Sequence, residues 1–424
     1  MFVMIAFVIT LLLGVPMAFV LGITAVTHII TMGDPRFLNI VVQRMFGGVN
    51  SFNLMCIPFF VLAGELMNYS GFTEKIVAFV RECVGMFRGG MAYVAIIVAA
   101  FLSAILGSAN AVAAILCTAI VPELVKDKYD KAFSAALIAA SGVLGPTIPP
   151  SMGFILMGVL TGASVNRLFM SGVIPGIVIA LGYMVIIFVY AKRRNYPKVR
   201  NEFGFKDFLK KFFIAFPSLL VPGIIVGGIL FGVFTPTESG AVAVGIALLG
   251  GIIYRSLKWS DFPKILFNTA IVTSSIMLIV SCGNIIGWTL AIDQIPKKLT
   301  ESILGFTTNP SAVMLLILLL LTGIGCVMDG FAAMIIFAPV FAPLATSVGF
   351  DLVHFSLIFA IMISIGLITP PVGMVLFVTS NITEVPLRKI NRAIVPFFIV
   401  AFAVTFIMAF LPQITLFLPN LLIK

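Results

Sequence analysis

The sequence predicts an all-α polytopic membrane protein with two inverted-topology repeats, each holding a re-entrant helical hairpin and a broken transmembrane helix. Composition is the first observation: 424 residues with 61% hydrophobic side chains, 10% charged side chains and a mean hydropathy of +1.20 exclude a soluble globular protein. The second is a Gly-x-x-x-Pro-Pro motif that occurs twice inside apolar runs, at Gly145–Pro150 and Gly366–Pro371. The third is a long apolar segment upstream of each motif.

Each proline pair breaks a helix that would otherwise cross the bilayer. Adjacent prolines remove two backbone donors and block the helix behind them, within residues 132–160 and again within 355–379. Freed carbonyls in hydrocarbon cost several kcal/mol each unless protein or an ion binds them. One such motif could be a packed kink. Two in matching positions indicate a duplicated unit with a binding site at the breaks.

The first unit, residues 1–191, predicts these elements in order. Residues 1–31 are either one long tilted helix or two short spans that turn at Gly14-Val-Pro16. A polar loop (33–50), a span (52–67), an amphipathic interfacial helix (71–88), a hairpin (89–122), the broken helix (132–160) and a span (173–190) follow. Residues 89–121 are too long for one span and too short for two, which favours the re-entrant hairpin.

The second unit, residues 213–424, repeats this order after a basic linker at 192–212. Its elements are spans at 213–232, 238–254 and 268–291, an interfacial piece at 296–306, a hairpin at 311–344, the broken helix at 355–379 and a final span at 393–418. Lysine and arginine in the linker place it in the cytoplasm. The first hairpin then opens to the cytoplasm and the second to the outside, so the repeats are inverted.

The polar residues of the two hairpins align at a nearly constant offset. Ser103 pairs with Thr322 and Asn110 with Asp329, 219 residues apart, while Gly145 and Gly366 differ by 221. The glycines of the first spans also align, Gly14 and Gly22 with Gly232 and Gly240. This alignment places one hairpin tip against each helix break near the middle of the membrane.

Uncharged oxygens at the tips and breaks predict sites for a small monovalent cation, because half-helix carbonyl ends carry negative charge. The alternative is that these are only small polar packing residues, which the repetition disfavours. The carboxylate of Asp329 at mid-depth is a functional candidate by default. The first site comprises Ser103, Ser108, Asn110, Gly145 and Pro149, and the second comprises Thr322, Gly325, Gly366 and Thr369.

Other polar residues carry less chemistry. His28 and His354 are isolated, and both are predicted at the membrane interface, while Glu238 is predicted to cap the helix that follows it. The sequence has no H-E-x-x-H, no C-x-x-C among its five cysteines, no Walker lysine motif and no nucleophile–base set. An intrinsic ATPase and an enzyme therefore have no support, and the net charge of +10 indicates basic cytoplasmic loops rather than nucleic-acid binding.

Four motifs together resemble the large membrane (M) subunit of TRAP (tripartite ATP-independent periplasmic) transporters, including the sialic acid type. They are Gly107-Ser-Ala-Asn110, Gly145-x-x-x-Pro-Pro150, Phe234-Thr-Pro-Thr-Glu-Ser-Gly-Ala241 and Gly366-x-x-x-Pro-Pro371, and the resemblance covers essentially the whole chain. It implies an elevator-type transporter of the bacterial inner membrane that is driven by sodium, with no organic cofactor. It also implies two partners, a separate small four-helix membrane subunit and a periplasmic substrate-binding protein.

The resemblance also implies site residues and cargo. One sodium site falls on Ser103, Ser108, Asn110 and Gly145, and the other on Gly325, Gly366 and Thr369. The cargo is expected to be an organic acid, of the sialic acid or C4-dicarboxylate class. It would lie between the tips, where the predicted contacts are Asn110, Thr147, Pro150, Asp329 and Pro371. A stand-alone sodium/anion symporter, a membrane enzyme and a channel are the alternatives.

Overall fold

The computed structural model describes residues 2–33, 36–198 and 204–423, and every regular element in these ranges is helical. The first repeat contains α1 (Phe2–Leu12), α2 (Met17–Thr31), α3 (Arg36–Val49), a 3₁₀ turn (Phe52–Met55), α4 (Cys56–Tyr69), α5 (Phe72–Val84), α6 (Gly90–Leu106), α7 (Ala109–Ala119), α8 (Val121–Lys126), α9 (Lys131–Gly142), α10 (Met152–Thr161) and α11 (Val165–Arg193). Eight helices in the described ranges are long and apolar enough to cross a membrane.

The second repeat follows the same order. It contains α12 (Phe205–Leu230), α13 (Pro236–Ile253), a 3₁₀ turn (Trp259–Asp261), α14 (Phe262–Ile292), α15 (Ile295–Phe306), α16 (Pro310–Val327), α17 (Gly330–Ser347), α18 (Leu352–Gly366), α19 (Met374–Thr383), α20 (Leu387–Ala409), α21 (Pro412–Thr415) and α22 (Phe417–Leu422). The helical hairpins are α6–α7 and α16–α17, and the broken helices are α9–α10 and α18–α19, as the sequence predicts.

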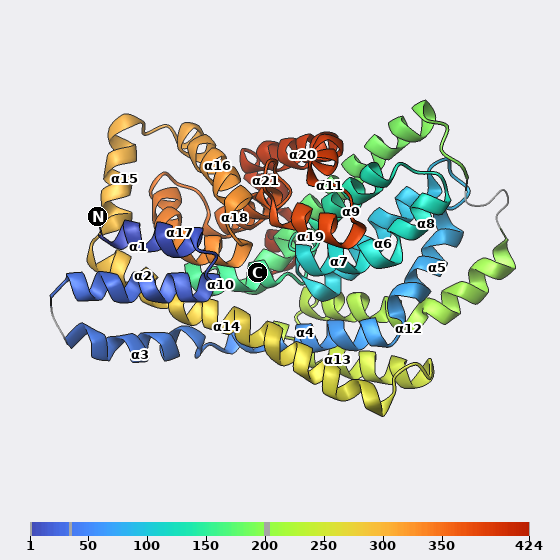
Figure 1. Cartoon of the computed structure of the whole chain (residues 1–424), viewed down its shortest axis with the longest axis horizontal. Coiled ribbons are helices and arrows are strands. Elements are labelled where there is room, and N and C mark those ends of the chain that lie inside the picture. Colours follow the sequence, from blue (N-terminus) through green and yellow to red (C-terminus); the bar gives the residue numbers. More distant parts are fainter. Residues whose placement is uncertain (1, 34–35, 199–203, 424) are drawn as a thin grey trace.

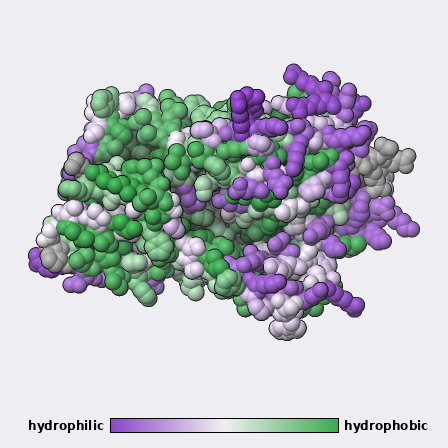
Figure 2. Space-filling model, in the orientation of Figure 1, coloured by the Kyte–Doolittle hydropathy of each residue, from purple (hydrophilic) through white to green (hydrophobic). Residues whose placement is uncertain are grey.

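The two hairpins enter the molecule from opposite ends (Figure 1). Hairpin α6–α7 lies at the end that also holds α5, α8 and the start of α12, whereas α16–α17 lies at the end that holds α15. The space-filling view shows hydrophilic side chains gathered at the first of these ends and an apolar surface over the other (Figure 2). The hydrophilic end holds basic side chains such as Arg81 of α5 and Lys126 of α8, which are among the residues on which the predicted orientation rests.

Helices from both repeats form the core. The hairpin helix α7 packs against α9 of its own repeat and against α19 of the other, while α17 packs against α10 and α18. The core at these contacts is made of small and aliphatic side chains such as Ala113, Ala136 and Val375, all fully buried. Small residues let helix backbones approach closely where no water drives association.

Two short helices occupy residues 2–31, so of the two readings of this segment the two-helix one holds. The turn between them uses Gly14 at φ +72°, a left-handed conformation that glycine adopts without strain. The equivalent turn in the second repeat uses Gly232 at φ +68°, and its helices α12 and α13 are longer. The predicted alignment of Gly14 with Gly232 is therefore confirmed in the turn geometry.

The predicted polar loop at 33–50 is wrong where the structure describes it, because α3 fills most of it. This helix packs along α14, and its last turns are held by side chains of that helix. Asn284 donates to the Arg44 carbonyl at 2.7 Å, and Ser281 donates to the Met45 carbonyl at 3.0 Å. The Arg44 guanidinium also lies 5.5 Å from the Trp288 ring centroid. Contacts with α14 thus stabilise a helix in a segment whose polar residues predict a loop.

Three further predictions can be compared with the structure. Glu238 is a cap: its carboxylate accepts the Thr235 N–H at 2.7 Å in a capping box. His354 is not an interface residue, because it is fully buried and its ring bonds Thr415 Oγ1 at 2.7 Å and the Ala409 carbonyl at 3.0 Å. The final span ends earlier than predicted, since α20 stops at Ala409 and two short helices follow.

Candidate functional site

In the first repeat, the tip of hairpin α6–α7 lies directly on the break between α9 and α10. A Cβ added at Gly145 would lie 2.8 Å from the Ser108 carbonyl oxygen, and one at Gly107 would lie 2.8 Å from the Met152 nitrogen. Gly107 also has φ +58°, so it turns the chain from α6 into α7. Backbone therefore meets backbone here, and no side chain separates the tip from the break.

The second repeat makes the same junction with a closer glycine pair. A Cβ at Gly366 would lie 2.5 Å from the Gly325 Cα, and one at Gly325 would lie 2.7 Å from the Ile363 carbonyl oxygen. The Gly373 N–H donates to the Cys326 carbonyl at 3.1 Å, which ties the far side of the break to the hairpin. Each hairpin and its broken helix thus form one unit, called here module 1 and module 2.

Four of the hydroxyl groups predicted as sodium ligands or cargo contacts donate their hydrogen within their own helix or turn. Ser103 donates to Ala99 at 2.6 Å and Thr147 to Val143 at 2.8 Å, and in module 2 Thr322 and Thr369 donate four residues back at 2.8 and 2.9 Å. Each hydroxyl oxygen keeps lone pairs that can still accept or coordinate. Hydroxyls with satisfied hydrogens are suited to a cation.

Asn110 holds an oxygen that lacks a protein partner among the described residues. Its side-chain Oδ1 is buried and accepts no hydrogen bond, and the same holds for the buried Oγ of Ser141 in the last turns of α9. Leaving such a group unsatisfied costs about 1–3 kcal/mol. The two helices are in contact, since a Cβ at Gly142 would lie 2.9 Å from the Ala109 carbonyl. Ser141 escaped the sequence analysis because one serine in an apolar run carries little signal.

Asp329 has a different position from the one that the sequence alignment gives it. It is the N-cap of α17, and its Oδ1 accepts the N–H groups of Phe331 at 3.0 Å and Ala332 at 3.3 Å. The N-cap of α7 is Ser108, so the structural equivalent of Asp329 is Ser108 and that of Asn110 is Phe331. The predicted pairings of Asn110 with Asp329 and of Ser103 with Thr322 are therefore both wrong by two residues, and the correct offset, 221, equals that of the proline motifs.

The two tips nearly meet in the middle of the molecule. A narrow gap of about 30 Å³ lies between them, lined by Ser108 and Asn110 of one tip and by Asp329 and Phe331 of the other. Ser364 of α18 also faces this gap. The tips thus bring together the polar residues of both repeats, as the sequence predicts.

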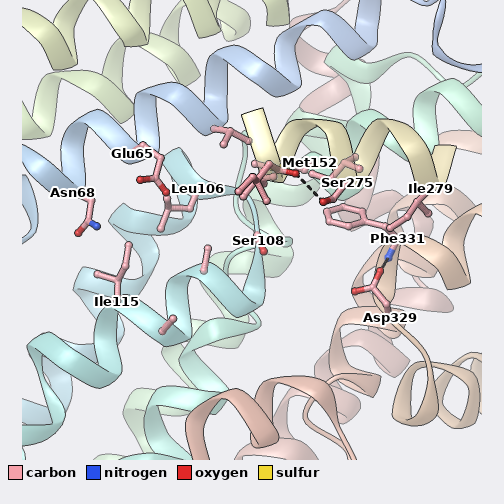
Figure 3. A pocket seen from close by; sticks show the side chains of 17 residues that line it. Glu65, Asn68, Leu106, Ser108, Ile115, Met152, Ser275, Ile279, Asp329 and Phe331 are labelled. Carbon is pink, nitrogen blue, oxygen red and sulfur yellow. Dashed lines mark hydrogen bonds between the residues drawn. The ribbon is translucent and has the colours of Figure 1, made fainter. Parts of the chain in front are cut away.

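A larger cavity of about 470 Å³ lies beside the tips, between module 1 and the pair α4 and α14 (Figure 3). Its polar lining comes from Glu65 and Asn68 of α4, Ser275 of α14, and the two N-caps Ser108 and Asp329. The rest of the wall is apolar and includes Leu106, Ile115, Met152, Ile276 and Ile279. Apolar walls with a few convergent polar groups are typical of small-molecule sites.

The residues predicted to contact cargo divide between the cavity and other places. Asp329 lines the cavity and Asn110 lines the gap. Thr147 is fully buried in the break between α9 and α10, and Pro150 is buried against Gly107 of the hairpin tip. Neither residue lines the cavity. Pro371 lies on the surface, where its carbonyl accepts from Asn391 of α20 at 3.0 Å. Sequence analysis missed Glu65 and Ser275, which lie far from the repeated motifs.

Comparison with known proteins gives the family. Residues 4–414 match the family model of the tripartite ATP-independent periplasmic transporter, DctM component. The sialic acid TRAP transporter large permease protein SiaM of Vibrio cholerae serotype O1 is 37% identical, over 96% of this chain and 95% of its own. The C4-dicarboxylate TRAP transporter large permease protein DctM of Pseudomonas aeruginosa is 33% identical, over 92% of each chain.

A solved structure supports the fold at low sequence identity. The YdaH transporter of Alcanivorax borkumensis superimposes with a TM-score of 0.60 over 89% of this chain and 88% of its own, at 12% identity. This chain and that transporter therefore share an overall fold. With the match of the family model over nearly the full length, these findings show that the chain belongs to the DctM family, the large membrane subunits of TRAP transporters.

Proposed function

We propose that this chain carries out sodium-driven uptake of an organic acid across the bacterial inner membrane. The observation that carries the proposal is the buried Asn110 Oδ1, which has no partner among the described residues and lies at the tip of hairpin 1. The same module holds hydroxyl oxygens whose hydrogens are already donated, at Ser103 and Thr147, and its tip lies on the backbone of the break. Hard oxygen ligands without competing donors suit a sodium ion that is carried together with the cargo.

Two sodium sites are proposed, one in each module. In module 1 the ion would be held by oxygens of Ser103, Ser108, Asn110 and Gly145, with Ser141 added from the structure and Pro149 at the edge of the break. In module 2 it would be held by oxygens of Thr322, Gly325, Gly366 and Thr369. Asp329 is not assigned to a sodium site, because its Oδ1 is engaged by the backbone of its own helix.

The cargo and partners are proposed from the family and its relatives. The two relatives compared are named for sialic acid and C4-dicarboxylates, which are both organic acids. The family description names a tripartite system. We infer that a periplasmic binding protein delivers the cargo and that a separate four-helix subunit accompanies this chain in the membrane. A stand-alone sodium/anion symporter is the alternative.

The cargo would cross by an elevator movement of the modules. Tip and break are in backbone contact in each module, so separating them would expose carbonyls to hydrocarbon at a cost of several kcal/mol each. Moving them together keeps these groups covered. Helices α4 and α14, with the amphipathic helices α5 and α15 as braces, would form the fixed wall past which the modules slide. The cavity lies on this sliding surface, because α4 and α14 line it on one side and residues of the modules line it on the other.

Uptake by proteoliposomes tests the proposal. The membrane complex is reconstituted with its binding protein, and uptake of a panel of radiolabelled organic acids is measured with and without an inward sodium gradient. We expect uptake that requires sodium and the binding protein. Uptake without the binding protein would favour the stand-alone symporter, and uptake driven equally by a proton gradient in the absence of sodium would refute sodium coupling.

Crosslinking tests the elevator movement. The short helix α8 joins the hairpin of module 1 to its broken helix and is counted with module 1 here. Arg81 of α5 and Glu123 of α8 form an ion pair at 3.7 Å, between the proposed brace and module 1. In a cysteine-free background, a short bifunctional reagent joining Arg81→Cys to Glu123→Cys should abolish transport. The control joins Glu82→Cys to Lys211→Cys, which pair between α5 and α12 outside the modules, and transport should continue. Full transport by the first crosslinked protein would rule out the movement.

A further inference from the structure

The charges in the large cavity identify the kind of organic acid that it accepts. This inference rests on the proposed function, since it takes the cavity of about 470 Å³ to be the cargo site. Two carboxylates, Glu65 and Asp329, line the cavity, and none of its described lining residues is Arg, Lys or His. A site for an anion that holds two acids and no base needs a physical explanation.

The polar side chains of this cavity are mainly hydrogen-bond acceptors. A carboxylate accepts hydrogen bonds through both of its oxygens. The hydroxyl hydrogen of Ser275 is donated to the Ile271 carbonyl at 2.7 Å, so that its oxygen is left to accept. Asn268 of α14 donates to Glu65 Oε2 at 3.3 Å, which fixes this carboxylate on the wall that does not belong to the modules. Among the described side chains that line the cavity, only those of Asn68 and Ser108 are left to donate into it.

Among the described lining residues, tip 1 is the place that favours a negative charge, because the start of α17 at tip 2 is already capped by the Asp329 carboxylate. The N-terminus of α7 begins at Ser108 there, and a sodium ion in module 1 would lie next to it. One carboxylate of the cargo can therefore be accommodated. The opposite wall, about Glu65 and Asn68, is built for groups that donate hydrogen bonds, and a second carboxylate there would face Glu65 with no counter-charge.

We propose that the cargo is a monocarboxylic acid whose remaining polar groups are hydroxyls or amides that donate hydrogen bonds, and that Glu65 and Asn68 select it. Such a molecule places its carboxylate at the tip and its hydroxyls on Glu65, Asn68 and Ser275. A C4-dicarboxylate is rejected because its second carboxylate meets Glu65. A polar site that hydrogen-bonds its substrate discriminates against analogues that lack the matching group.

Binding to the purified membrane complex tests this selection apart from the binding protein. Calorimetry in sodium buffer compares gluconate and N-acetylneuraminate with succinate and fumarate. We expect at least one hydroxylated monocarboxylate to bind at least tenfold more tightly than either dicarboxylate. Equal or tighter binding of the dicarboxylates would overturn the inference. Absence of sodium-dependent binding by every acid would instead count against the proposed function.

Two variants and a control test whether Glu65 and Asn68 of α4 select monocarboxylic over dicarboxylic acids. Glu65→Gln removes the charge but can still accept from Asn268, and it should reduce the preference for monocarboxylates at least fivefold. Asn68→Lys supplies the missing counter-charge at an exposed position and should increase succinate affinity at least tenfold. Glu74→Gln, in the separate charged cavity of about 760 Å³ beside α5, should change neither ratio. An unchanged ratio in both Glu65→Gln and Asn68→Lys would refute the assignment.

Discussion

The tips of the two modules are equivalent in position but differ in chemistry. Tip 1 has Ser108 as its N-cap, with no side-chain capping bond among the described residues, and Asn110 two residues later with a buried oxygen that lacks a partner. Tip 2 has Asp329 as its N-cap, with two backbone bonds, and Phe331 in the place of Asn110. Tip 1 therefore offers an open ligand, while tip 2 is satisfied by its own chain.

This difference separates two tasks that the repeated motifs of the sequence assign equally to both halves. A side-chain oxygen without a donor would be stabilised by an ion, so under the proposed function module 1 would gain most from sodium. A capped helix start with an aromatic residue beside it is stable without one, so in module 2 the ion would depend on carbonyl and hydroxyl oxygens alone. The following predictions test this contrast, from the largest expected effect to the smallest.

The largest effect is expected at the glycine pair of module 2. Gly366→Ala places a methyl group 2.5 Å from the Gly325 Cα, where backbone must move. Overpacking of this kind costs about 1–3 kcal/mol, and here it also separates tip and break. We expect loss of more than nine-tenths of the uptake activity in proteoliposomes. Gly323→Ala is the control, since a Cβ there meets no described atom within 4 Å, and its uptake should be normal.

Asn110→Ala should weaken sodium activation without loss of folding stability. The change removes a ligand oxygen and also a buried polar group that lacks a partner in the described structure. We expect the sodium concentration for half-maximal uptake to increase about tenfold, equivalent to about 1.4 kcal/mol. Thermal unfolding without sodium should be unchanged or slightly later. If the sodium dependence stays normal, Asn110 is a packing residue and the contrast between the tips fails.

Asp329→Ala should lower the stability of the folded protein more than it changes sodium activation. Loss of an N-cap costs about 0.5–2 kcal/mol, so the variant should unfold at a lower temperature both with and without sodium. Asp329→Ser keeps a capping oxygen and should restore most of the stability. Thermal unfolding in sodium and in potassium measures both. A variant that is destabilised only in sodium would show that Asp329 binds the ion, and the two tips would then be alike.

The sequence predicts the modules well because their signals are local. Proline pairs, glycines and small polar residues lie within a few positions of the structure that they determine, and both breaks and both hairpins occur where expected. The predicted pairing of Asn110 with Asp329 also aligns Ala113-Ala114 with Ala332-Ala333, and such Ala-Ala pairs recur in small-residue helices and can align in more than one register. The preference of Asp for N-caps, read together with the Gly330 that follows, was the signal for the correct one.

The rest of the site depends on contacts between distant segments. Glu65 and Ser275 come together only because α4 and α14 pack side by side, and neither residue belongs to a motif. The sequence predicts a loop where the structure has α3, because this helix is stabilised by hydrogen bonds from Asn284 and Ser281 of the distant helix α14. Sequence patterns within one segment carry no information on such partners.

The smallest effect is expected at the ion pair between Arg81 and Glu123. The pair joins the brace α5 to module 1 at the end where tip 1's hairpin enters, and both side chains are partly exposed. Exposed ion pairs contribute about 0.2–1 kcal/mol. Since the pair would break when module 1 slides away from α5, Arg81→Ala should shift the balance between the two end states by about two- to fivefold rather than abolish transport. Module 2 does not take part in this ion pair. A change in the end-state balance of module 1 alone would therefore add a further difference between the two modules.

Distance measurements between spin labels on α5 and α8 report that balance. The charge swap Arg81→Glu with Glu123→Arg should restore the wild-type distribution, whereas each single reversal should shift it further than Arg81→Ala. Lys126→Ala is the control, because Lys126 bonds Glu123 within α8 at 2.5 Å and does not reach the brace. An equal shift in the control would mean that the charge of Glu123, and not its contact with α5, sets the balance.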